Sequence, residues 1–314
     1  MGLGVAFMTV YVSRSISEVL DRLNWDIVRK FKRIYIKINM VSAYNVLSMT
    51  PPDAVKELVT FLREKINYDG KIIIAEGSAL GSTYEGFRNA NIIELAKQYD
   101  IELFDIHEDS FFEVPLFNHR FEEISIPVSK SLVNSEFLIS ICRAKTHDTV
   151  IVTLTLKNVA VGGIVGKNYR GKIHQGYPAI NVNIAILSGI LFPDIGIIDG
   201  KIGMEGDGPV SGTPKSWGYV FAGNNPLEVD AIVSRAMGFD PNTIGYLYYL
   251  SKLGFGKIND IDLVGFSLDD ISTRFRPHRE YKNQLNWKLD PEFEEEILKK
   301  SNNIIKKYSR KTVI

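Results

Sequence analysis

Lys71-Ile72-Ile73-Ile74-Ala75-Glu76-Gly77 is a short run of β-branched residues that ends in an acid and a glycine. Such a continuous apolar run indicates a buried strand. Before it, isoleucines alternate with polar residues over 34–39, and a helix is expected to begin at Thr50-Pro51-Pro52. After it, a helix is expected over 91–99 and a strand over 101–105. This strand–helix order predicts a parallel or mixed sheet with helices on its faces.

The rest of the chain continues the alternation of strands and helices. Residues 149–158 are ambiguous, because their β-branched residues favour a strand while their length also suits a buried helix. The sequence therefore predicts an α/β protein with a mixed, largely parallel sheet, helices on both faces, a glycine-rich second half and a C-terminal helical tail. Further strands are expected at 124–127, 137–141, 195–198, 219–222 and 261–264, and further helices at 178–191, 225–237 and 242–253.

The composition changes after Phe266, where basic residues gather and a closing helix begins at Asp290-Pro291. We therefore expect an α/β domain over 1–266, with two lobes of about 1–142 and 143–266, followed by a basic helical tail over 267–314.

Charge and hydrophobicity exclude several classes of protein. The 314 residues carry 37 basic and 37 acidic side chains, so no net positive charge favours nucleic acid. Hydrophobic residues make up 45%, which is enough for a sizeable core. No apolar run reaches the ~18 residues that span a bilayer, and residues 1–12 lack the basic region and cleavage site of a secretory signal. These features predict a cytoplasmic protein without a membrane segment.

The chain has one cysteine, Cys142, in an apolar stretch. One thiol can form no internal disulfide and cannot hold an iron–sulfur cluster or a multi-cysteine zinc site by itself. We therefore expect no iron–sulfur cluster from this chain alone.

Residues 203–214, Gly-Met-Glu-Gly-Asp-Gly-Pro-Val-Ser-Gly-Thr-Pro, contain too much glycine and proline for a regular element. They predict a tightly bent loop after an apolar strand, with Glu205 and Asp207 inside it. Loops at such positions carry chemistry in many α/β enzymes. A structural turn with two solvated acids explains the pattern equally well.

Lys145-Thr146-His147 is expected to lie in a loop that follows the strand at 137–141. A lysine, a hydroxyl and an imidazole at a strand's carboxyl end can bind an anion or move a proton. An ordinary polar surface loop is the alternative.

A second cationic motif begins at Lys157-Asn158 and continues through the glycines to Lys167-Asn168. A Walker loop needs glycine at position 161 and a hydroxyl residue at 168, and neither is present. A glycine-rich anion site therefore remains as the hypothesis. His174 follows, and together with His147 it is a weak candidate pair of metal ligands.

Short motifs follow one another along the chain in a fixed order. They are Lys37-Ile38-Asn39, Glu76-Gly77, Lys145-Thr146-His147, Leu156-Lys157-Asn158, Asp199-Gly200, Gly206-Asp207-Gly208-Pro209, Asn225-Pro226, Asp230-Ala231 and Met237-Gly238-Phe239-Asp240-Pro241. In this order they resemble the family known as domain of unknown function 362. The resemblance covers about 35–265, but the cysteine-rich ferredoxin-like segment that many members carry is missing, which puts an electron-transfer role in doubt. It implies that the polar motifs form one site and does not assign their chemistry.

We therefore predict an enzyme that acts on an anionic small molecule. The alternative is a non-catalytic binding or assembly protein that uses the basic tail, and a homo-oligomer is compatible with either. The residues expected to act in catalysis are Lys145, His147 and Lys157; those expected to bind the anion are Lys37, Asn39, Gly77, Asn158, Gly163, Lys167 and Gly208; the candidate ligands of a divalent metal are Asp199, Asp207 and Asp230.

Overall fold

The computed structural model describes residues 9–310. Residues 1–8 and 311–314, including Lys311 of the predicted tail, lie outside the described part. The described chain forms a nine-stranded sheet in the order β11-β1-β10-β9-β7-β2-β3-β4, with β8 paired to β7. The strands are β1 Thr9–Ser13, β2 Arg33–Lys37, β3 Lys71–Glu76, β4 Ile101–Asp105, β7 Leu138–His147, β8 Ile151–Thr153, β9 Ile195–Glu205, β10 Thr213–Gly223 and β11 Asp262–Val264.

The sheet is mixed and largely parallel, as the sequence predicts. Strands β4, β3, β2, β7 and β9 run parallel to one another. Strand β10 pairs antiparallel with both β9 and β1, and β11 lies parallel to β1 at the edge. The carboxyl ends of five neighbouring parallel strands therefore meet at one edge, which is where open α/β sheets bind ligands.

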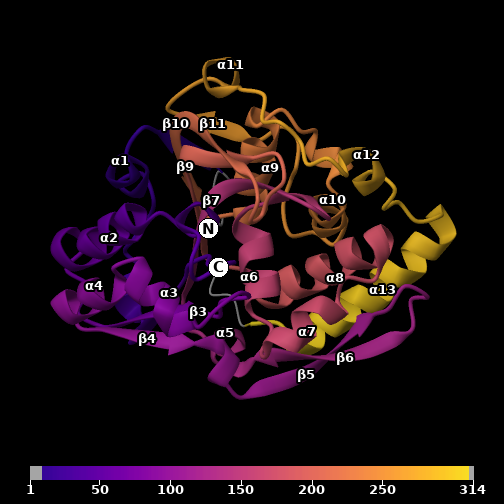
Figure 1. The fold of residues 1–314 in the computed structure, drawn as a ribbon, viewed down its shortest axis with the longest axis horizontal. Helices are drawn as coiled ribbons and strands as arrows, with labels where there is room; N and C mark the ends of the chain where they lie inside the picture. The colour runs from indigo at the N-terminus through magenta and orange to yellow at the C-terminus, as the bar shows by residue number, and fades with distance from the viewer. Residues whose placement is uncertain (1–8, 311–314) are drawn as a thin grey trace, which may run out of the picture.

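Helices cover both faces of the sheet (Figure 1). Along β2, Ile34 and Ile36 enter one hydrophobic core and Tyr35 enters the other, because successive side chains of a strand point to opposite faces. One face packs against α1 Ile16–Leu20, α2 Pro52–Thr60, α3 Thr83–Asn89 and α4 Ile92–Tyr99; the other packs against α6 Thr155–Gly162, α8 Gly176–Ile190, α9 Pro226–Ala236 and α10 Gly245–Lys252.

A second, two-stranded sheet lies outside α8. Strands β5 Phe111–Phe117 and β6 Glu123–Ser129 are antiparallel, and the Asn183 side chain joins them to α8 by hydrogen bonds to both the amide and the carbonyl of Phe117. The remaining short elements are α5 Lys130–Val133, α7 Lys167–Lys172, the 3₁₀ turns Val28–Lys30, Val46–Ser48, Ile106–Glu108 and Pro241–Thr243, and a π-helical turn Phe61–Lys65.

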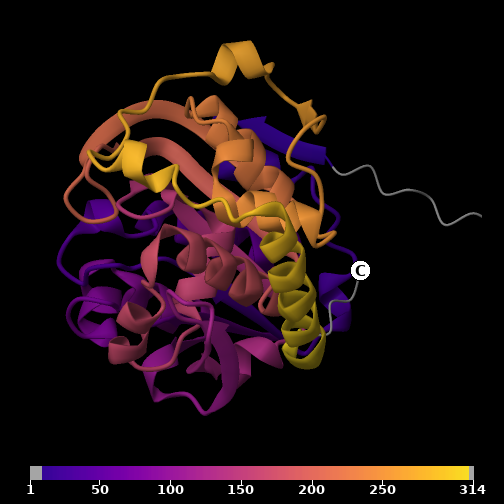
Figure 2. The same cartoon turned by 90° about the vertical axis from the view of Figure 1, so that its right-hand side faces the viewer.

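The C-terminal segment packs on the α/β body. It contains α11 Leu268–Ile271, α12 Tyr281–Gln284 and α13 Pro291–Tyr308, and Figure 2 shows α13 along the outside of the helical layer. Trp287 is buried, and the Arg310 side chain forms a buried ion pair with Asp194. Within residues 9–310, no helix has both the length and the apolar character needed to cross a bilayer.

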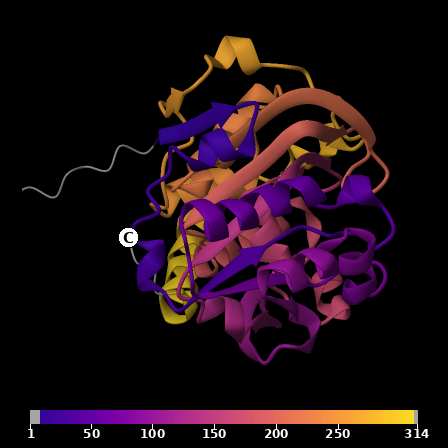
Figure 3. The same cartoon turned by 90° about the vertical axis from the view of Figure 1, so that its left-hand side faces the viewer.

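Long-range pairing changes three local expectations. Strand β7 continues to His147, because β8 pairs with its last three residues, so Lys145-Thr146-His147 is strand and not loop. Strands β9 and β10 form a long curved hairpin (Figure 3), which shortens the expected loop at 203–214 to residues 206–212. The ambiguous segment 149–158 contains both β8 and the start of α6.

Candidate functional site

A cavity of about 630 Å³ opens at the carboxyl ends of β2, β3 and β7. Its wall also includes the first turns of α6, the end of α7, and the hairpin turn between β9 and β10. Among the predicted site residues, the cavity wall contains Asn39, His147, Lys157, Asn158, Asp207 and Gly208.

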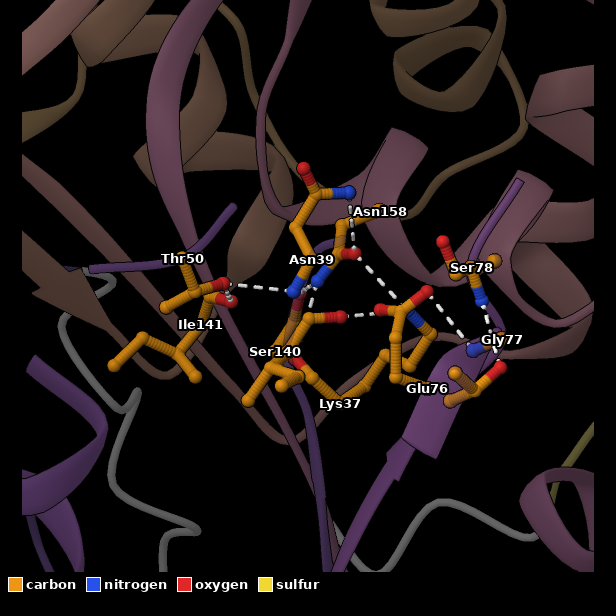
Figure 4. Close-up of polar contacts among 12 residues, drawn as sticks. Lys37, Asn39, Thr50, Glu76, Gly77, Ser78, Ser140, Ile141 and Asn158 are labelled. Carbon is orange, nitrogen blue, oxygen red and sulfur yellow. Dashed lines mark hydrogen bonds and ion pairs between the residues drawn. The ribbon is translucent and has the colours of Figure 1, made fainter. Parts of the chain in front are cut away.

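Lys37 lies under the floor of this cavity and is completely buried. Its ammonium donates hydrogen bonds to the carboxylate of Glu76 at 2.5 Å, to the carbonyl of Ile38 at 2.6 Å and to Oδ1 of Asn158 at 3.2 Å (Figure 4). Burial lowers the pKa of Lys37 and raises that of Glu76, and each group's charge opposes the shift of the other. With all three donors paired and a carboxylate adjacent, we assign the pair as ionised.

Two asparagines extend this network across the floor. Asn158 donates from Nδ2 to the carbonyl of Lys37 and to the hydroxyl of Ser140, both at 3.1 Å, and accepts from Asn39 at 3.2 Å (Figure 4). Lys145 donates to Oδ1 of Asn39 at 2.5 Å and to the carbonyl of Ser48 at 2.8 Å. Burial lowers the pKa of Lys145 to about 7. Lys37 and Lys145 therefore orient the two asparagines from behind, and the asparagines face the cavity.

Lys157 differs from the other two buried lysines. It lies in the first turn of α6, is 8% exposed and lines the cavity. No described residue hydrogen-bonds to its Nζ atom. Burial is the main cause that lowers the pKa of Lys157 to about 8, and the nearby Asp148 opposes this shift. The ammonium is therefore held in a poorly solvated site without an adjacent protein acceptor.

His147 ends β7 beside the cavity, and its ring is oriented by the chain that follows. The amide of Thr149 donates to Nδ1 at 3.0 Å, so Nδ1 uses its lone pair and the neutral ring carries its proton on Nε2. Asp148 also lies 3.0 Å from Nδ1, but burial, followed by Lys157, lowers the pKa of His147 well below its usual value. The ring is therefore neutral, the contact with Asp148 is not an ion pair, and Nε2 is a hydrogen-bond donor.

Two further side chains of the cavity were not predicted from the sequence. Thr153, at the end of β8, is 2% exposed, and its hydroxyl is buried without a partner among the described residues. Arg170 of α7 donates to the carbonyls of Gly77 and Gly162 at 2.5 and 3.2 Å and lies near Glu76. The basic character of 167–172 pointed to this segment, whereas nothing local distinguishes Thr153.

Asp207 lies at the mouth of the cavity in the hairpin turn. It accepts hydrogen bonds from the backbone and guanidinium of Arg279, and its carboxylate is 3.6 Å from Nε2 of His278. The hydrogen bond from Arg279 is the main cause that lowers the pKa of Asp207 to about 2. The segment after Phe266 therefore contributes to the site, which its composition alone did not indicate.

Several predicted residues have structural contacts instead of lining the cavity. Lys167 donates to the carbonyl of Gly81. A side chain at Gly77 would contact Arg170 and His107 at 3.0 Å, and one at Gly163 would collide with Leu191. These positions need small residues for packing, so the anion-binding role predicted for Gly77, Gly163 and Lys167 has no support from the geometry.

The three acids predicted as metal ligands do not come together. Asp199 lies on β9, and its carboxylate accepts a hydrogen bond from the backbone amide of Lys201 at 2.8 Å. Asp230 of α9 accepts from the amides of Thr155 and Leu156 at 2.9 Å and so caps α6. In residues 9–310, no group of three or more histidine, cysteine or acidic residues is close enough to hold a metal. This corrects the predicted metal set, because each acid is used by its own strand, helix end or arginine.

Comparisons with known proteins give a family and one distant relative. The sequence profile of domain of unknown function DUF362 matches residues 34–235. A thylakoid-associated protein from Synechocystis sp. is 23% identical over 250 residues, which are 77% of this chain and 74% of that protein. The solved structure of the lactate racemase apoprotein from Thermoanaerobacterium thermosaccharolyticum aligns with 69% of this chain at 13% identity and a TM-score of 0.46; the alignment spans 54% of that structure.

Proposed function

The chain belongs to the DUF362 family, a domain of unknown function, and we propose that it is an enzyme that binds an anionic small molecule in the cavity above β2, β3 and β7. The observation that carries the proposal is Lys157, a buried ammonium that lines the cavity and has no partner among the described residues. A buried charge without a hydrogen-bonded partner is costly, and although Asp148 lies near enough to raise the pKa of Lys157, an anionic ligand would supply the missing acceptor.

The arrangement of the polar motifs supports catalysis over assembly. Lys37, Lys145, His147, Lys157 and Asp207 gather around or directly beneath one cavity, although they come from strands and loops that are far apart in the sequence. A protein that used these groups only to contact a partner would present them on an open surface. A cavity that buries a small ligand is the usual form of an active site.

His147 is the group best placed to donate a hydrogen bond to the reacting part of a ligand. Its Nε2 carries the proton and is free of protein partners in the described chain, and its ring is held by the amide of Thr149. In the proposed role, Lys157 binds the anionic group and the Nε2–H group of His147 donates a hydrogen bond to the atom of the ligand where negative charge develops. Asn39 and Asn158 are fixed by the buried lysines and can orient the same ligand.

The alternative role, assembly through the basic C-terminal segment, receives less support. Arg310 is used internally by Asp194, and Arg279 is used by Asp207 at the mouth of the cavity. The exposed lysines of α13 include Lys300, which pairs with Glu296 one turn earlier. These contacts are those of a packed helix with a solvated charged face.

Calorimetric titration with a panel of small anions, including acetate and inorganic phosphate, tests the binding step. We expect at least one anion to bind the wild-type protein and to bind Lys157→Met at least tenfold more weakly. Lys56→Met is the matched control, because Lys56 is exposed on α2, which packs on the other face of the sheet. Failure of every anion to bind, or equal binding by Lys157→Met, would overturn the proposal.

The catalytic step needs a separate readout. The protein is incubated in D₂O with a pool of small carboxylic and phosphorylated compounds, and the pool is followed by mass spectrometry for deuterium uptake or new products. We expect a change with the wild-type protein and none with His147→Gln, while His147→Gln still binds the anion. Binding without any change in the pool would support a binding protein over an enzyme.

A further inference from the structure

The wall of the cavity combines two chemically different groups of residues. Lys157, Thr153 and His147 come from α6, β8 and β7, and we call them the polar side; Val41, Leu80 and Val210 come from the loops after β2 and β3 and from the hairpin turn, and we call them the apolar side. Leu80 remains 52% exposed although it lines the cavity. A large apolar side chain that faces a cavity without being covered by protein is a surface on which a ligand's apolar part can be buried.

The apolar side is held in place by backbone pairing. The amide of Leu80 donates to the carbonyl of Val41 at 2.9 Å, and the amide of Ala43 donates to the carbonyl of Leu80 at 2.8 Å. Asn45 donates from its side chain to the carbonyl of Val210 at 2.8 Å. These bonds join the loop after β2, the loop after β3 and the hairpin turn into one wall, so the apolar surface exists before a ligand binds.

Thr153 and Lys157 are neighbouring residues of the polar side whose polar groups have no hydrogen-bond partner in the described chain. Thr153 lies opposite Lys145 in the pairing of β8 with β7 and precedes Lys157 by four residues. Its hydroxyl is buried and has no partner in the described chain. The ammonium of Lys157, which lines the same cavity, hydrogen-bonds to no described residue. A buried hydroxyl without a partner costs free energy, and a carboxylate oxygen could accept from both groups.

The charge of the cavity favours a single negative charge on the ligand. Arg279 is paired with Asp207, and Lys37 beneath the floor is paired with Glu76. Arg170 uses its two terminal nitrogens on backbone carbonyls, and its Nε atom alone is without a partner among the described residues. Among the cavity-lining cations that the structure describes, Lys157 is therefore the one whose donors are all unused, and it can compensate one negative charge.

We propose that the ligand of this cavity is an amphiphilic monocarboxylate, whose carboxylate is bound by Lys157 and Thr153 and whose apolar part lies against Leu80 and Val210. The proposal rests on the proposed function, because it names the class of anion that the same cavity accepts. It adds Thr153 as a binding residue and assigns the apolar wall a role in specificity.

Calorimetric titration with acetate, butanoate, hexanoate and octanoate at pH 6.5 tests this proposal. We expect the affinity to rise about fourfold for each methylene group that the wall buries. Inorganic phosphate and the uncharged hexanamide are expected to bind more weakly than hexanoate. The two controls separate the contribution of the carboxylate from that of the apolar chain.

Three variants locate the two halves of the ligand. Leu80→Ser should reduce the preference for hexanoate over acetate by at least threefold and leave acetate binding unchanged. Val264→Ser, at an exposed valine on the edge strand β11, is the matched control and should change neither. Thr153→Val keeps the shape of the side chain, and we expect it to weaken all the acids by roughly tenfold.

The outcomes separate this proposal from the broader one. Equal affinity for acetate and octanoate, or tighter binding of phosphate than of any carboxylate, would overturn the amphiphilic monocarboxylate while anion binding stands. If hexanamide binds as well as hexanoate, or no anion binds at all, the proposed function fails as well. If Thr153→Val does not fold, as judged by circular dichroism, the chain-length series and Leu80→Ser still decide the question.

Discussion

Lys37 and Lys157 are both buried lysines of the same site, but their ammonium groups have opposite surroundings. Lys37 donates to three protein acceptors within 3.2 Å, one of them the carboxylate of Glu76. The ammonium of Lys157 has no protein acceptor in the described chain, although the next residue, Asn158, is one of the acceptors of Lys37. A buried ion with every donor paired maintains the structure, whereas a buried ion without a partner is suited to a ligand.

The difference follows from where each lysine lies. Lys37 ends β2 directly beside β3, so Glu76 at the end of β3 can reach it. Lys157 extends from the first turn of α6 into the cavity. The sheet therefore builds a satisfied polar floor, and the helix places an unsatisfied charge above it.

The largest effect on this comparison should come from Lys37→Met. The substitution leaves the carboxylate of Glu76, which is 2% exposed, without its ion-pair partner. Removing one member of a buried ion pair costs about 3–5 kcal/mol, so we expect the free energy of unfolding to fall by that amount. Urea unfolding followed by circular dichroism measures it.

The double variant Lys37→Met with Glu76→Gln is the control, because it removes both charges. It should regain a large part of the lost stability, since no unpaired buried charge remains. If Lys37→Met is as stable as the wild-type protein, the two lysines do not differ in the way described.

A smaller effect is expected from Asp230→Ala, which tests the structural role of a predicted metal ligand. Asp230 accepts from both the amide and the hydroxyl of Thr155 and from the amide of Leu156, at the start of the helix that carries Lys157. Burial raises the pKa of Asp230 to about 7. Loss of the cap should reduce the free energy of unfolding by about 2 kcal/mol, measured by urea unfolding at pH 8.

Asp230→Asn keeps an acceptor of the same shape and should lose less stability than Asp230→Ala. The metal hypothesis makes a different prediction, namely that a chelator destabilises the wild-type protein as much as Asp230→Ala does. The two treatments therefore separate a helix cap from a metal ligand.

The fold was largely predictable because its signals are local. The strand at 71–76 was recognised from one apolar run, and the helix after Asn225 from its cap and the following proline. Strands β1 and β5 were not predicted, β6 was predicted only over 124–127, and β7 and β9 proved longer than expected. Their pairing partners lie far away in the chain, so composition within a short window cannot indicate where such strands end.

The site was only partly predictable for the same reason. Motifs at strand ends correctly pointed to several residues that line one cavity, among them His147 and Lys157. Thr153 and Arg279 carry no local signal, since what distinguishes them is a missing partner or a contact across the fold. Conversely, the sequence predicts Asp230 as a metal ligand, whereas in the structure its carboxylate caps α6. Whether a polar group has a hydrogen-bond partner depends on residues far away in the sequence, and a short sequence window does not contain them.

The smallest effect on stability should come from Lys157→Met, which removes the buried ammonium that has no partner in the described chain. Removal of a buried charge that has no partner relieves a desolvation cost, and methionine fills a similar volume. At pH 7 we therefore expect the variant to be at least as stable as the wild-type protein, with a gain of up to about 1 kcal/mol. Lys37→Met, at the paired position, should show the opposite sign.

The pH dependence of this gain provides the internal check. The pKa of Lys157 is about 8 in the folded protein and about 10.4 in an unfolded chain, so between these values the unfolded chain holds more protons and wild-type stability rises with pH. Lys157→Met lacks this contribution, and its advantage at pH 7 should shrink or reverse at pH 9.5. Urea unfolding at the two pH values measures the difference in free energy of unfolding between the two proteins. Lys145 is present in both, so its own pH-dependent contribution cancels. A loss of more than about 2 kcal/mol at pH 7 would instead show that the ammonium of Lys157 has a protein partner, and the distinction between the two lysines would fail.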